Sequence, residues 1–85
     1  METIKIKVEF YSVLRDQVTK VPEVTVEIPS GQTLQNLLDK LFLEFPSLKD
    51  WDKQLLLAAD LDYIEREHVL REGEVISIMP PVQGG

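Results

Sequence analysis

Cysteine is absent from this 85-residue chain, and histidine occurs once, as His68. Without cysteine there is no disulfide framework and no cysteine-ligated metal site, and one histidine does not make an ordinary zinc site. A catalytic thiol and a persulfide relay within the chain are excluded for the same reason. If this protein handles sulfur, the sulfur must be carried by something other than a thiol side chain.

Positive charge is also scarce, because 9 Lys and Arg residues stand against 15 Asp and Glu, a formal net charge of −6. Proteins that bind the phosphate backbone of nucleic acids need a basic surface. We therefore expect no nucleic-acid partner and favour partners with basic faces. The longest apolar run, Leu55–Ala59, is far too short to cross a bilayer, and the first residues read as a strand instead of a signal peptide. We expect a soluble, cytoplasmic protein without a membrane partner.

Motifs for catalysis or cofactor binding are missing as well. Gly31 and Gly73 stand alone in turns and form no phosphate-binding loop. The serines have no partner for a catalytic triad other than His68, which we interpret as a surface-loop residue. A carboxylate-rich stretch lacks the spacing and the central glycine of a calcium loop, so we interpret it as a solvated acidic turn and expect no metal site. Its members are Asp60, Asp62, Glu65 and Glu67.

The hydrophobic pattern predicts an α+β domain. Period-two alternation predicts strands over 4–10 and 24–28, and a helical stripe predicts one clear helix over 34–45, with Thr33 as its N-cap. Apolar runs predict a buried strand over 55–59 and a final strand over 75–79. One helix on a mixed sheet of four or five strands gives a two-layer domain with the first and last strands side by side at the centre.

For the segments that connect these strands and the helix, the sequence predicts turns, loops and short helices. Residues 13–18 are predicted to form a short helical turn, 60–63 a turn, and 65–70 a charged loop. Residues 47–54 are interpreted as a loop or short helix in which Trp51 is a lid on the core. A partner-facing Trp51 is the alternative.

The final seven residues, Met79–Gly85, differ in character from the body of the chain. Pro80 and Pro81 remove two backbone donors, so neither a helix nor a central strand continues through them. Six residues beyond Met79 reach about 20 Å when extended, which is enough to enter a deep pocket in another protein. A frayed chain end is the alternative interpretation. The coincidence of Pro-Pro with a terminal Gly-Gly favours a functional tail.

We therefore divide the chain into a domain, 1–79, and an extended reactive tail, 80–85. The group left for chemistry is the terminal carboxylate of Gly85. A carboxylate is a poor electrophile, but it becomes a good one as an acyl-adenylate, from which sulfide or an amine displaces AMP. An enzyme for this reaction would admit the tail through a narrow channel, and glycine alone has no side chain to block it. The residues do not distinguish sulfide from an amine.

Three stretches resemble the ubiquitin-like sulfur carriers: Ile4–Tyr11, Pro29–Leu34 before the helix, and Arg66–Glu74 before the last strand. The ending Ile78–Gly85, which contains Pro-Pro-Val-Gln-Gly-Gly, resembles the small subunits of molybdopterin synthase in particular. The similarity covers essentially the whole chain. The thiamine-pathway carriers share Gly-Gly but usually lack Pro-Pro.

The resemblance implies a β-grasp fold and a role as a non-catalytic sulfur-donor subunit that itself binds no cofactor. An E1-like activating enzyme would use ATP to adenylate Gly85, and a sulfur donor protein would then supply the sulfur of a thiocarboxylate. The tail would deliver this sulfur to precursor Z within the large subunit of molybdopterin synthase, in a heterotetramer of two small and two large subunits. The exposed sheet face near the last strand would dock the partner. The partner-binding tail residues implied are Pro80, Pro81, Val82, Gln83 and Gly84.

Other functions remain open from the sequence. A ubiquitin-like modifier joined to lysines of target proteins starts from the same adenylate, and a sulfur carrier for another pathway, such as thiamine or tRNA thiolation, has the same ending. A purely structural interaction domain is the third alternative. One segment also departs from the family, since relatives commonly read Val-Asn-Gly where this chain has Ala59-Asp60-Leu61. The missing glycine leaves the geometry of this turn open.

Overall fold

The structure is a computed structural model, and it describes residues 2–81 of the chain. Over these residues the chain forms five strands, one α-helix and two shorter helical segments. In order they are β1 (Thr3–Phe10), η1 (Leu14–Thr19), β2 (Glu23–Pro29), α1 (Leu34–Glu44), η2 (Pro46–Gln54), β3 (Leu56–Ala59), β4 (Asp62–Tyr63) and β5 (Val75–Met79).

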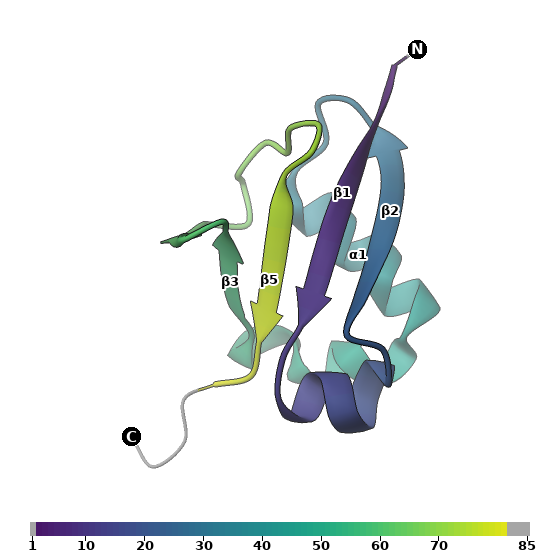
Figure 1. The fold of residues 1–85 in the computed structure, drawn as a ribbon, viewed down its shortest axis with the longest axis vertical. Coiled ribbons are helices and arrows are strands. Elements are labelled where there is room, and N and C mark those ends of the chain that lie inside the picture. The colour runs from purple at the N-terminus through teal and green to yellow at the C-terminus, as the bar shows by residue number, and fades with distance from the viewer. Residues whose placement is uncertain (1, 82–85) are drawn as a thin grey trace.

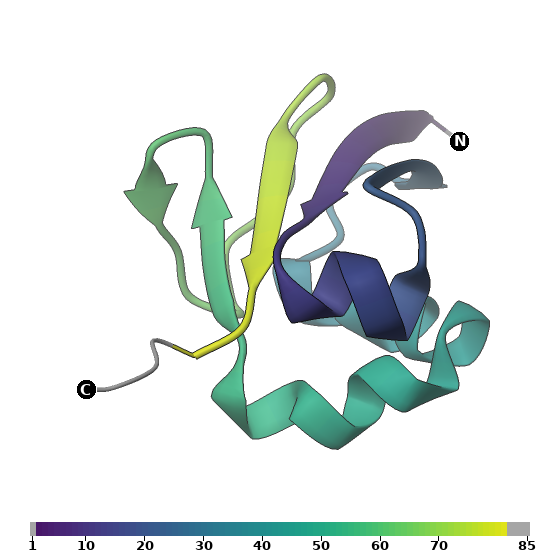
Figure 2. The same ribbon diagram turned by 60° about the horizontal axis from the view of Figure 1, so that its bottom comes forward.

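The strands form one mixed sheet in the order β2-β1-β5-β3-β4. The first and last strands, β1 and β5, are parallel neighbours at its centre, and the other neighbouring strands pair antiparallel. Figure 1 shows α1 crossing behind this sheet, and Figure 2 shows the helical segments gathered on the same side. The predicted two-layer α+β architecture is confirmed, and the arrangement is a β-grasp fold.

Alternation along the strands builds the inner face of the sheet. The inward side chains of β1 are buried and the intervening Lys5 is exposed. Opposite them, α1 presents its apolar stripe, and each large apolar side chain that becomes fully buried contributes about 1.5–3 kcal/mol. The core side chains from these two elements are Ile4, Ile6, Val8, Phe10, Leu34, Leu37, Leu38, Leu41 and Phe42.

Both ends of α1 are defined by local chemistry. The Thr33 hydroxyl accepts a hydrogen bond from the Asn36 backbone N–H, and the Asn36 side chain accepts one from the Thr33 N–H, which closes a capping box. The helix ends at Glu44, with Phe45 as its C-cap, because Pro46 follows. The Phe45 ring then packs edge-on against Phe10, with ring centroids 5.7 Å apart.

The segment between β4 and β5 closes over the start of α1. The Leu34 N–H donates to the His68 carbonyl oxygen at 2.9 Å, and the Gln35 N–H donates to the Arg66 carbonyl oxygen at 3.0 Å. These bonds satisfy two of the N–H groups that a helix leaves free in its first turn. The long connection is therefore held against the helix.

Several details differ from the sequence-based expectations. Residues 60–63, predicted as a turn, contain the two-residue strand β4, whose Tyr63 pairs with Ala58. His68 lies in a loop, as predicted, but it is half-buried, and its Nε2 lies 2.8 Å from Glu74 Oε2. The helical turn expected at 13–18 is confirmed as η1, and Trp51 in η2 packs against the core, as expected of a lid.

The turn that departs from the family pattern contains a residue with left-handed backbone angles that is not glycine. Asp60 has φ of 55°, a region that aspartate tolerates better than most residues because its short polar side chain bonds locally. The hairpin of β3 and β4 therefore forms with Asp60-Leu61 at its tip. Across the described part of the chain, no helix has the length and apolarity needed to span a membrane.

Candidate functional site

The tail leaves the domain from the end of the central strand β5. Met79, Pro80 and Pro81 are half-buried, and β5 ends at Met79. The Tyr11 N–H donates to the Ile78 carbonyl oxygen at 3.3 Å, which ties the end of β1 to the end of β5. The predicted site residues Val82, Gln83, Gly84 and Gly85 lie outside the described residues.

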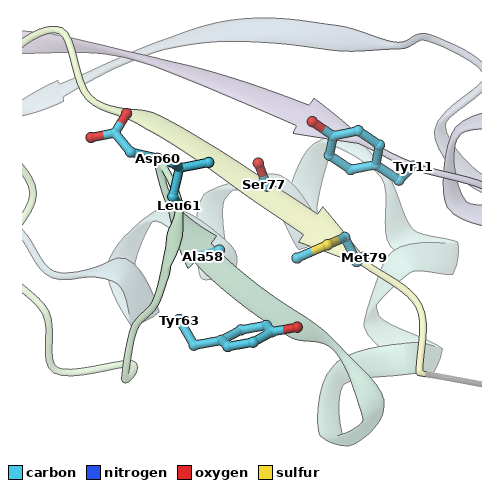
Figure 3. Close-up of a pocket in the computed structure, with 7 residues that line it drawn as sticks. All are labelled: Tyr11, Ala58, Asp60, Leu61, Tyr63, Ser77 and Met79. Carbon is cyan, nitrogen blue, oxygen red and sulfur yellow. The ribbon is translucent and has the colours of Figure 1, made fainter.

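A hollow of about 300 Å³ lies beside the root of the tail, on the sheet face opposite α1 (Figure 3). Ala58 and Ser77, which pair across β3 and β5, lie between the larger side chains that surround them. We call this feature the tail-root hollow. Its lining residues are Tyr11, Ala58, Asp60, Leu61, Tyr63, Ser77 and Met79.

The hollow follows from side-chain size on the outer face. Tyr63 is the cross-strand partner of Ala58, and Met79 lies one outward position beyond Ser77 along β5. The two small residues therefore leave a depression among large ones, and they are buried although they belong to the outer face. The surroundings stay apolar and accessible, since Tyr11 is 39% and Tyr63 is 74% exposed.

Charge is distributed unevenly around this hollow. Asp60 lines it, and Asp62 is exposed next to it on the hairpin. On the neighbouring β1, the Tyr11 hydroxyl donates to Glu9 Oε1 at 2.7 Å. Lys7 lies 3.8 Å from a Glu9 oxygen and 3.5 Å from a Glu23 oxygen. The hollow is therefore apolar with an acidic edge toward the start of β5, and Lys7 at that end of the sheet is already paired.

The other polar candidates do not assemble into a reactive centre. Asp60, Asp62, Glu65 and Glu67 are all exposed, and within residues 2–81 no three metal-ligating side chains come together. His68 pairs with Glu74 at the opposite end of β5 from the tail. The Arg15 guanidinium donates to Asp16 and thereby lowers the pKa of that carboxyl, but this exposed pair lies on η1.

A family model described as ThiS matches residues 8–85. The chain belongs to the ThiS family. The match extends across the tail as well as the β-grasp domain.

Individual relatives of this ThiS-family chain agree with that assignment. The chain is 35% identical over 83 residues to the molybdopterin synthase sulfur carrier subunit of Arabidopsis thaliana, which covers 98% of this chain and 85% of that protein. Among solved structures, a candidate molybdopterin converting factor subunit 1 from Pyrococcus furiosus has 25% identity and a TM-score of 0.83, covering 93% of this chain and 99% of that one.

A further solved structure resembles the chain in fold. It is a protein–protein complex of subunits 1 and 2 of molybdopterin-converting factor from Helicobacter pylori 26695. The matched chain is 24% identical, with a TM-score of 0.68, and the match covers 96% of this chain and all of that chain.

Sequence reasoning found the tail but not the hollow. Alternation along β5 places Ser77 and Met79 opposite the buried Ile76 and Ile78, so the outer position of these two residues was available from the pattern. The position of Tyr63 could not be predicted from the sequence, because a two-residue strand leaves no periodic signal.

Proposed function

We propose that this chain is the sulfur carrier subunit of a molybdopterin synthase and donates sulfur from its C-terminal glycine. The observation that carries the proposal is the 35% identity, across 98% of the chain, to a protein named as that subunit in Arabidopsis thaliana. The Gly-Gly ending and the absence of cysteine support it, because they leave the terminal carboxylate as the place to carry sulfur. The subunit itself is not the catalyst.

The chemistry at Gly85 proceeds in two balanced steps. On an activating enzyme, a carboxylate oxygen of Gly85 attacks the α-phosphorus of ATP. Pyrophosphate leaves, and an acyl-adenylate is formed. Sulfide from a sulfur donor then attacks the carbonyl carbon, and AMP leaves as a thiocarboxylate forms. The domain contributes by presenting an unhindered carbonyl carbon at the end of a tail whose last two residues have no side chain.

The tail-root hollow is the surface that we assign to docking on the large subunit. It combines apolar side chains with small central residues, a shape that accepts a protruding apolar group. Because it lies at the start of the tail, docking there directs Pro80, Pro81 and the residues beyond toward the partner's channel. Two small and two large subunits would make up the synthase.

Reconstitution tests this proposal. The chain is prepared as its C-terminal thiocarboxylate and mixed with the cognate large subunit and precursor Z, and molybdopterin is measured. We expect product from the thiocarboxylate and none from the carboxylate form. The dithiolene holds two sulfur atoms, so two thiocarboxylates are consumed for each product formed.

The matched control is the same chain without Gly85, which keeps the domain and loses the reactive end. We expect it to fold and to give no product. Failure of the thiocarboxylate to yield molybdopterin with an active large subunit contradicts the proposal. Recovery of this chain joined through Gly85 to lysines of cellular proteins, without such transfer, assigns it to the modifiers instead.

A further inference from the structure

Leu61 is the most exposed large apolar side chain in the described part of the structure, with 99% of its surface accessible. It lies at the tip of the hairpin formed by β3 and β4 and lines the tail-root hollow (Figure 3). Isolated surface leucines are common and need no explanation. Leu61 differs because it lines the same hollow as Tyr63, Tyr11 and Met79.

The hairpin tip is held in place, so Leu61 projects from a defined position. The Asp60 N–H donates to the Val75 carbonyl oxygen at 3.1 Å, which fastens the turn to the start of β5. Ala59 and Asp62 pair beneath it. A turn whose backbone is already held in place loses less entropy on binding than a mobile loop does. Its exposure means that it contributes almost nothing to the fold.

Charge identifies the kind of surface that fits this tip. Leu61 stands between two exposed carboxylates, Asp60 and Asp62, and the whole chain has a net charge of −6. An apolar pocket with acidic walls would repel both carboxylates. A complementary surface is an apolar pocket bordered by lysine or arginine.

We propose that Leu61 is a specificity-determining residue, which inserts into an apolar pocket of the large subunit bordered by basic side chains that pair with Asp60 and Asp62. This rests on the function proposed above, because the large subunit is the occupant. A partner without the pocket meets a protruding leucine and two unpaired carboxylates, and these disfavour the wrong complex. The tip therefore selects the partner, and the tail carries the chemistry.

The first experiment replaces Leu61 with alanine and measures Kd for the purified cognate large subunit by calorimetry. Loss of a buried anchor at an interface predicts binding weaker by about tenfold. The matched control is Leu43→Ala, because Leu43 is also an exposed leucine, at 84%, but lies on α1, across the sheet from the hollow. We expect Leu43→Ala to bind like the wild type.

The second experiment removes charge from the tip with the double variant Asp60→Asn and Asp62→Asn. Asparagine also tolerates the left-handed φ of residue 60, so the turn is kept. We expect association with the large subunit to slow several-fold at low salt and to match the wild type at high salt, since salt screens exposed charges.

The outcomes separate this inference from the function itself. If wild type binds the large subunit and transfers sulfur, and Leu61→Ala binds like Leu43→Ala, the role of Leu61 is wrong and the function stands. If the wild type neither binds the large subunit nor transfers sulfur, both the role of Leu61 and the proposed function are wrong. Leu61→Gln, which keeps length and removes apolar surface, should weaken binding as Leu61→Ala does while the melting temperature stays at the wild-type value. Wild-type affinity of Leu61→Gln overturns the inference.

Discussion

At the scale of single residues, Arg66 links three parts of the domain. Its guanidinium donates to Gln35 Oε1 at 3.1 Å and to Asp52 Oδ1 at 2.6 Å, and it also donates to the Asp52 carbonyl oxygen. These partners belong to α1 and η2, whereas Arg66 lies in the connection to β5. The planar guanidinium is suited to this because it offers several donors in a fixed geometry.

Replacing Arg66 with alanine is expected to lower the free energy of unfolding by about 1–2 kcal/mol, because charge-assisted hydrogen bonds on a half-buried side chain are lost. Urea unfolding followed by circular dichroism measures this change. The Asp52 and Gln35 side chains regain water, which limits the loss.

Arg15→Ala is the matched control for Arg66. Arg15 is exposed and bonds its neighbour Asp16, whose pKa is lowered by that hydrogen bond. A lowered carboxyl pKa means that the pair's stabilisation is present at neutral pH and is lost as the pH falls through the folded pKa. Because solvent screens the pair, we expect no measurable change in the urea midpoint at pH 7. Equal effects of the two variants would contradict the linking role of Arg66.

The role of Arg66 was not predictable from the sequence. Its two partners are 31 and 14 positions away along the chain, and no periodic pattern connects them. The same limit applied to His68, which was predicted to be a surface-loop residue but is half-buried and lies against Glu74. Residue contacts of this kind depend on tertiary packing, whereas the terminal Gly-Gly is visible in the sequence itself.

At the scale of elements, the start of α1 is stabilised from two directions. The capping box of Thr33 and Asn36 supplies local bonds, and the carbonyl oxygens of Arg66 and His68 supply distant ones. The helix therefore begins at a fixed point, and the connection to β5 is aligned with it.

Thr33→Ala is expected to cost about 1 kcal/mol of stability, because the N-cap hydroxyl no longer accepts the Asn36 N–H. Thr33→Ser is the control, since serine keeps the accepting oxygen and is expected to remain near the wild type. Chemical unfolding of the three proteins measures the difference. If Thr33→Ser loses as much as Thr33→Ala, the capping hydroxyl is not the cause.

Elements with strong periodicity were predicted correctly, and the short one was not. The helix over 34–45 has a helical apolar stripe, the strands over 4–10 and 24–28 alternate, and 75–79 is an apolar run. All four elements are confirmed within a residue or two. β4 has two residues, so only its pairing with β3 identifies it as a strand. The tail-root hollow went unpredicted with it, since Tyr63 belongs to β4.

At the scale of the whole molecule, the proposed function makes the domain a support for a reactive chain end. The central strand β5 is hydrogen-bonded on both sides, and the tail continues directly from it. The apolar hollow reaches the start of the tail at Met79, and the acidic hairpin tip lies at the other end of the hollow, near the start of β5. In the function that we propose, the domain supplies recognition and the terminal carboxyl supplies the chemistry.

This division predicts that the terminal glycines contribute nothing to folding. We expect a chain that ends at Gln83 to unfold at the wild-type urea concentration and to be inert toward an activating enzyme. A large loss of stability in this variant would mean that the ending serves the fold, and the account would need revision.

The most direct test of the central claim is the intact mass of the full chain after incubation with its activating enzyme, ATP and a sulfur source. The account predicts a mass increase equal to the exchange of one oxygen for one sulfur, located at Gly85 by fragmentation and missing from the chain that ends at Gln83. An unchanged mass in a system that thiocarboxylates a known carrier would contradict it.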